Sequence, residues 1–204
     1  MRLHGYSIEN DLAPNYTFAE TVLLALTGQL PSPEKGRAFE IALTFLAQTS
    51  AAEGPIHATL LARICVASTS ALTGTGAIAL GEQARFELSS YVPFLEWLSY
   101  NESGPPSAFI TDDPSSRKQT VALRDALHAR KALVPRTLLT CLQPRAATIA
   151  VLYACGVTSL EQIEAVQTFA RYPLLMAEVL AAPPAKYKDY PVNLPAMRYE
   201  ENVQ

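Results

Sequence analysis

Residues 52–81, AEGPIHATLLARICVASTSALTGTGAIALG, combine a helical spacing of apolar residues with unusually small side chains. Apolar positions recur with the period of a helix from Ile56 to Leu80, and alanine, serine and glycine fill much of the rest. Small residues let helix backbones approach closely, although each interior glycine costs about 1 kcal/mol relative to alanine. The pattern predicts helical structure over 56–80, with a pair of helices over 58–81, as closely packed core or as the wall of a site.

Other segments carry helix signals of the same kind. The capping-box sequence from Thr17 to Glu20 predicts a helix that begins at Phe18 and ends near Thr27, and Ser32-Pro33 predicts the start of another. Further helices are expected at 87–100, 117–131, 136–155 with an interruption at Pro144, and 160–182. Because no segment shows the alternation of a strand, we expect an all-α fold.

Two segments differ in composition from these helices. Residues 101–116 are rich in glycine, proline, serine and aspartate, which predicts a mobile surface loop or a hinge between two helical lobes. Residues 183–204 begin with two prolines and carry three tyrosines, and we expect an extended arm there. Apart from these, the chain is expected to form one helical domain over 1–204.

Charge and residue usage exclude several function classes. A net charge of -3 provides no basic field for nucleic acid, and the apolar stretches are interrupted before they reach the roughly 18 residues of a membrane span. The isolated Cys65, Cys141 and Cys155 are typical of reduced, buried thiols in a cytoplasmic protein. Three isolated histidines and three isolated cysteines offer no metal-ligand spacing, so no metal is expected.

The order of several motifs resembles the citrate synthase family, including its short citryl-CoA lyase-like members. Residues 5–9 (GYSIE), 17–22 (TFAETV) and 26–31 (LTGQLP) are similar to the family's opening, and 58–63 (ATLLAR) to its "STFAAR" segment. The segment that begins Phe169-Ala170-Arg171 is similar to its "ARxxGWxAH" helix. The resemblance implies a citrate synthase-like multi-helical fold, truncated relative to full-length members.

The resemblance also implies chemistry and partners. A citrate synthase deprotonates the methyl group of an acyl-CoA and adds the enolate to an oxoacid, using a carboxylate base, two imidazoles and arginines for the substrate carboxylates. A CoA thioester is therefore the expected substrate class, with no permanently bound cofactor. Expected partners are a second copy of the chain or a citrate synthase-like paralogue.

The chain departs from the family at the acid/base positions. In an ungapped alignment on Arg63, the first family histidine falls on Glu53, the second on the segment Gly81 to Arg85, and the aspartate near Ala147. All three are thus substituted. Arg171 matches a substrate-carboxylate arginine of the family, and Arg145 is a second candidate for the same role.

Glu53 and His57 are the candidate catalytic groups. Glu53 could act as a general base if burial raises its pKa, or it could be a solvated carboxylate near a helix start. His57 could replace the enolate-binding imidazole after a shift of one helical turn, or it could pack at the start of its helix. Arg63 could be purely structural, with a helix terminus or a carboxylate as its partner.

Two hypotheses of function remain open. In the first, the protein binds an acyl-CoA or a di- or tricarboxylate and makes or cleaves a carbon–carbon bond, with Glu53 or His57 as acid/base and Arg145 and Arg171 as carboxylate anchors. In the second, it is a catalytically silent paralogue that serves as a structural or regulatory subunit.

Overall fold

The computed structural model describes residues 1–50, 52–100 and 104–182, and their fold is all-α, as predicted. The helices are α1 (Phe18–Thr27), α2 (Pro33–Leu46), α3 (Gly54–Ile64), α4 (Thr69–Leu88), α5 (Val92–Tyr100), α6 (Pro114–Ala129), α7 (Pro144–Cys155) and α8 (Leu160–Ala181). Short helical turns η1 (Ile8–Leu12), η2 (Ser89–Tyr91) and η3 (Ser107–Phe109) join them. The arm predicted at 183–204 and residues 101–103 of the predicted hinge lie outside the described residues.

The helix starts follow the local chemistry of their caps. Thr17 Oγ1 accepts the amide of Glu20 at 3.2 Å, and the Glu20 carboxylate accepts the Thr17 amide at 2.8 Å. The same reciprocal capping box joins Ser159 and Gln162 at the start of α8. Each pair satisfies backbone donors that a helix start leaves without partners, which explains why these helix starts can be predicted from the sequence.

Several predicted helices have different boundaries in the structure. The helix expected over 87–100 begins only at Val92, since residues 87–88 belong to α4 and residues 89–91 form η2. The helix expected over 117–131 is α6, Pro114–Ala129, so it begins within the predicted loop.

The helical stretch expected over 56–80 forms two helices, α3 and α4, in line with the expected pair, and α4 continues to Leu88; Val66 between them has a left-handed conformation (φ 60°) and Ser68 caps the start of α4. The helix expected over 136–155 begins only at Pro144, because proline disfavours helical backbone in the residue before it and Gln143 has ψ 146°.

A small hairpin precedes the helices and was not predicted. Its strands, β1 (Arg2–Leu3) and β2 (Tyr6–Ser7), pair antiparallel, with Arg2 opposite Ser7. The turn uses positive φ at His4 and Gly5, a conformation that glycine adopts without strain. Because each strand has only two residues, the hairpin does not change the fold class.

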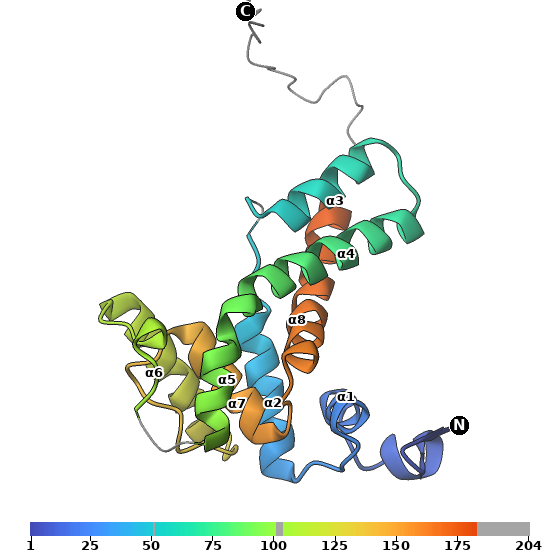
Figure 1. Cartoon of the computed structure of the whole chain (residues 1–204). Coiled ribbons are helices and arrows are strands. Elements are labelled where there is room, and N and C mark those ends of the chain that lie inside the picture. Colours follow the sequence, from blue (N-terminus) through green and yellow to red (C-terminus); the bar gives the residue numbers. More distant parts are fainter. Residues whose placement is uncertain (51, 101–103, 183–204) are drawn as a thin grey trace, which may run out of the picture.

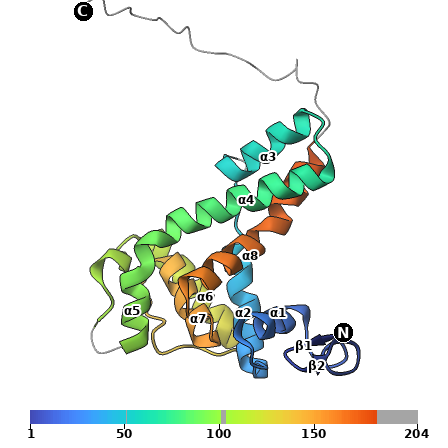
Figure 2. The ribbon, with the colours of Figure 1, turned by 45° about the vertical axis from the view of Figure 1, so that its right-hand side comes forward.

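The helices form a body and a projecting end (Figure 1). The larger apolar core is formed by α2, α5, α6, α7 and the first half of α8. A second, smaller core is formed by α3, α4 and the last half of α8. The long helices α4 and α8 pack against each other and run through both parts, as both views show (Figures 1 and 2). A polar cleft lies at the junction of the two cores.

Candidate functional site

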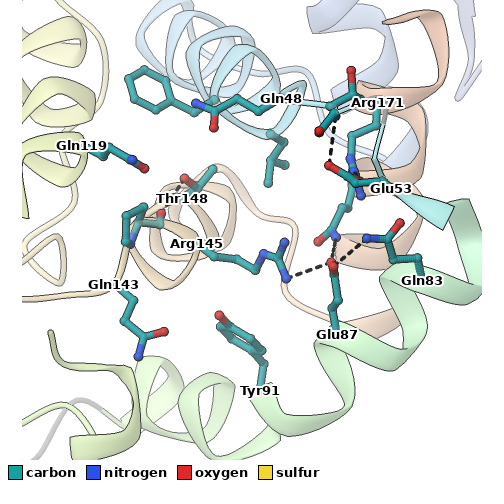
Figure 3. Close-up of a pocket in the computed structure, with 16 residues that line it drawn as sticks. Gln48, Glu53, Gln83, Glu87, Tyr91, Gln119, Gln143, Arg145, Thr148 and Arg171 are labelled. Atoms are coloured by element: carbon teal, nitrogen blue, oxygen red, sulfur yellow. Dashed lines mark hydrogen bonds and ion pairs between the residues drawn. The ribbon is translucent and has the colours of Figure 1, made fainter. Parts of the chain in front are cut away.

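A polar cleft with a volume of about 640 Å³ lies at this junction (Figure 3). Residues from five helices, from η2 and from the segment after α2 line it: Phe45, Leu46, Gln48, Thr49, Ser50, Glu53, Gln83, Glu87, Tyr91, Gln119, Gln143, Pro144, Arg145, Thr148, Gln167 and Arg171. Two arginines, two glutamates and five glutamines are among them. The lining is therefore polar but has no net formal charge.

Arg171 is the most deeply buried charge of the cleft. Its side chain extends from α8, the residue is only 5% exposed, and its Nη2 forms an ion pair with Glu53 Oε2. The other Glu53 oxygen accepts the Ser50 amide at 3.1 Å. Because a charge this far from solvent needs a partner, the pair ties α8 to the residue that precedes α3.

Glu87 of α4 is the centre of a second network (Figure 3). Its Oε2 lies 2.8 Å from Arg145 Nη1 and accepts the Gln167 amide nitrogen at 2.7 Å. Its Oε1 accepts the Gln83 amide nitrogen at 2.9 Å. Three donors from α4, α7 and α8 thus meet on one carboxylate, which fixes the Arg145 guanidinium at the cleft wall.

Three buried polar atoms of the lining have no hydrogen-bond partner within the described residues: Gln83 Oε1, Gln167 Oε1 and Arg171 Nε. The two amide oxygens are turned away from Glu87 because their nitrogens donate to it. Most buried polar groups in proteins are hydrogen-bonded. Unused hydrogen-bonding capacity at a cleft wall indicates a place where water or a ligand is bound.

The start of α7 and Tyr91 complete the polar wall. Pro144, Arg145 and Thr148 lie in the first turns of α7, where the helix dipole favours a negative charge, and Gln143 forms no side-chain cap there. Burial raises the pKa of the Tyr91 phenol above 10.0, and Glu87 also raises it, while Arg145 lowers it. Tyr91 is therefore a neutral phenol at neutral pH.

The structure brings three of the four predicted site residues together. Glu53, Arg145 and Arg171 line the cleft, whereas His57 is exposed on α3 and is not among the lining residues. The His57 amide donates to the Glu53 carbonyl at 3.0 Å as part of the helix start.

Arg63 has the helix-terminus role expected as one alternative, since its Nε and Nη2 donate to the carbonyls of Ala182 and Leu180, each at 3.1 Å.

The segments that the alignment assigned to the family's acid/base positions meet at this cleft. Glu53 lines it directly, Gln83 lines it from the segment Gly81 to Arg85, and Thr148 lines it beside the fully buried Ala147. Three segments far apart in the sequence therefore surround one cavity without a histidine in its lining.

Sequence reasoning missed Glu87, Gln83, Gln167 and Tyr91. A signal for two of them exists: Gln167 is a polar residue within the buried stripe of α8, one turn before Arg171. Glu87 follows Gln83 by one turn on α4, which places both on one helix face. Neither spacing predicts that Gln167 and Glu87 are hydrogen-bonded to each other, since they are 80 residues apart in the sequence.

Residues 1–50, 52–100 and 104–182 contain neither a cluster of metal-ligating side chains nor a single helix suited to cross a membrane. No three His, Cys, Asp or Glu side chains are gathered there as a metal site would require. No single helix there has both the length and the apolar character to cross a membrane, although α7 and α8 taken together, bent by 113°, pass the same test of length and composition.

Comparison with known proteins supports the architecture. A solved structure of citryl-CoA lyase from Hydrogenobacter thermophilus superposes with a TM-score of 0.68, covering 97% of this chain and 91% of that chain. The fold is citrate synthase-like. The two sequences are 18% identical, so the likeness concerns the fold alone. No family model and no curated protein sequence matches the chain.

Proposed function

We propose that the cleft binds a di- or tricarboxylate, alone or as part of an acyl-CoA ester, with Arg171 and Arg145 as the carboxylate anchors. The observation that carries the proposal is the convergence of these two arginines, from α8 and α7, on one cavity. Guanidinium groups suit carboxylates because their planar forks donate two parallel hydrogen bonds. Arg171 is buried, where charge-assisted bonds are stronger than in water.

Other groups of the cleft favour the binding of an anionic ligand. Arg145 uses Nη1 for Glu87 and is 39% exposed, so its remaining donors can face a bound molecule. The first turn of α7 adds the positive end of a helix dipole, and the neutral Tyr91 phenol is a further hydrogen-bond donor. The lyase whose fold is similar acts on an ester of this class, as its name states.

Within this proposal the reaction is condensation of an acyl-CoA with an oxoacid, or cleavage of a citryl-CoA-type ester. In the cleavage direction a base takes the hydroxyl proton, the carbon–carbon bond breaks, and the products are a ketone and a thioester enolate that is then protonated. Glu53 is the candidate base because its carboxylate lines the cleft beside Arg171. His57 could take part only after a movement that brings its imidazole into the cleft.

A silent structural or regulatory subunit is the second candidate function. Both glutamates of the lining are held in ion pairs, and the lining contains no histidine. Such a subunit needs a partner, a second copy or a paralogue. The outward face of α4 is a candidate surface, because Ile78 and Phe86 are 69% and 82% exposed and a side chain at Gly74 would meet open space.

One assay separates these functions. The purified protein is incubated with acetyl-CoA and oxaloacetate, and separately with citryl-CoA, while free thiol and thioester are followed. Turnover with either supports the enzyme, and the variant Glu53→Gln should then lose it without losing the fold. No turnover, together with a raised melting temperature in citrate or CoA, supports the binding subunit. If neither turnover nor stabilisation is observed, the proposed function of the cleft is contradicted.

A further inference from the structure

The contact between Glu53 and Arg171 leaves the guanidinium half used. Glu53 engages only Nη2, and the neighbouring Nε of Arg171 is buried without a partner in the described structure. A free carboxylate that approached the same edge could accept from Nε and Nη2 together, which is the favoured geometry of an arginine–carboxylate pair. Arg171 therefore makes a weaker pair with Glu53 than it can make with a ligand.

We infer that Glu53 occupies the position of a ligand carboxylate on Arg171 and is exchanged for that carboxylate when the ligand binds. The inference deepens the proposed function and rests on it, since it requires Arg171 to be a carboxylate anchor. It makes Glu53 a specificity-determining residue. Only a ligand that carries a negative charge can replace the Glu53 carboxylate without leaving the buried guanidinium unpaired.

Glu53 can leave its partner more easily than the other glutamate of the cleft. Apart from Arg171, its carboxylate accepts one backbone amide, and its side chain is 28% exposed, so a change of side-chain rotamer can move it off Arg171 to another position at the cleft, where it stays available as the base. Glu87 accepts from two amides and one guanidinium and is 20% exposed. Exchange at Glu87 would break three bonds, and exchange at Glu53 breaks two.

The charge of the cleft changes in step with the exchange. With Glu53 on Arg171 and Glu87 on Arg145, each lining arginine is neutralised within the chain. When the Glu53 carboxylate turns away, Arg171 is left as one uncompensated positive charge. A neutral ester or amide of the same shape gains nothing from that charge, so the cleft should discriminate strongly between an acid and its ester.

The experiment measures citrate affinity by calorimetry at fixed ionic strength, with trimethyl citrate as the neutral probe. Glu53→Gln removes the competing charge, and Glu53→Asp shortens its reach while keeping the charge. Glu82→Gln is the matched control, because Glu82 is exposed on α4 and does not line the cleft. We expect both Glu53 variants to lower the dissociation constant for citrate about tenfold, with no gain for the control.

Each outcome bears on the inference. Tighter citrate binding by the Glu53 variants, with trimethyl citrate bound weakly by all forms, supports the exchange, and so does binding seen in the variants alone. If the wild type binds citrate and both folded Glu53 variants bind it equally or more weakly, the exchange is refuted while the proposed function stands. If no form binds citrate, the exchange is refuted, and turnover of citryl-CoA then decides separately whether the proposed function stands. Circular dichroism of each variant verifies the fold.

Discussion

Gln167 and Arg171 lie one turn apart on α8 and connect the same helix face to two different carboxylates. Gln167 donates to Glu87 of α4, and Arg171 pairs with Glu53 ahead of α3. Because α8 runs through both apolar cores, one helix positions both networks at the junction between them. The cleft is thus held by long-range polar contacts rather than by a single loop.

Removal of the Glu87 charge should destabilise the protein. In Glu87→Gln, Arg145 loses its counter-charge and the two glutamine amides lose a charged acceptor. Hydrogen bonds to charged groups contribute about 1.5–3 kcal/mol each, and partial exposure of the pair reduces this, so we expect a loss of about 1–3 kcal/mol. Urea denaturation measures it. Equal stability of Glu87→Gln and the surface variant Glu82→Gln would contradict the role of the network.

Two conservative arginine substitutions should separate ligand binding from stability. Arg171→Lys keeps the charge but loses the fork, so the rise in melting temperature caused by citrate should largely disappear. Arg63→Lys should keep that rise but lower the stability of the free protein by about 1–2 kcal/mol, because Arg63 satisfies two carbonyls at the end of α8. Thermal melts with and without citrate test both. A full citrate response in Arg171→Lys would show that Arg171 is not an anchor.

Sequence reasoning succeeded where local chemistry decides structure. The caps at Thr17 and Ser32 satisfy amides within three residues, so these helix starts could be predicted. The start of α8 at Leu160 was predicted too, although its capping box was expected on Thr158 and Glu161 and is formed by Ser159 and Gln162.

A pair of helices was expected over 58–81, but the position of the reversal at Val66 was not, because its left-handed conformation depends on how α3 and α4 fold back against each other. Helical periodicity does not reveal where such a reversal lies.

In the cleft, too, residues whose role depends on packing between distant helices could not be predicted. Glu53, Arg145 and Arg171 were expected at the site through the family resemblance, and all three line one cavity. Glu87 and Gln167 were not expected, because each is a single polar residue on a helix and its role depends on a partner from another helix. Such pairings are set by the packing of α4 on α8, which helical periodicity does not specify.

The packing of α4 on α8 depends on which glycine faces the neighbouring helix. A methyl group at Gly76 would lie 2.7 Å from Leu175 Cδ2 and 3.3 Å from Thr59 Oγ1, whereas one at Gly74 would meet open space. We therefore expect Gly76→Ala to cost about 1–3 kcal/mol through overpacking. Gly74→Ala should gain up to about 1 kcal/mol from helix propensity. Denaturant titration of the two variants checks this, and equal stabilities would contradict the close approach of the helices.

Cys155 should make stability fall at alkaline pH. Burial raises the pKa of its thiol from 9.0 to about 12, and Sγ contacts the Lys35 carbonyl at 3.6 Å. Between these two values the unfolded chain loses the thiol proton while the folded chain keeps it. Stability is therefore fully present below pH 9 and decreases as the pH rises toward 12, by up to about 1.4 kcal/mol per unit from this group.

The matched variant Cys155→Ala isolates this contribution, because every other titrating group is common to both proteins. Urea denaturation at pH 7.5, 9 and 10 should show a steeper loss of stability in the wild type than in the variant. Buried thiols were expected at all three cysteines, but Cys65, just after α3, is exposed. Thiol reagents at pH 8 should therefore modify Cys65 in the native state and leave Cys155 unmodified until unfolding. Parallel pH profiles, or rapid native-state labelling of Cys155, would show that the thiol is not shielded as its position on α7 implies.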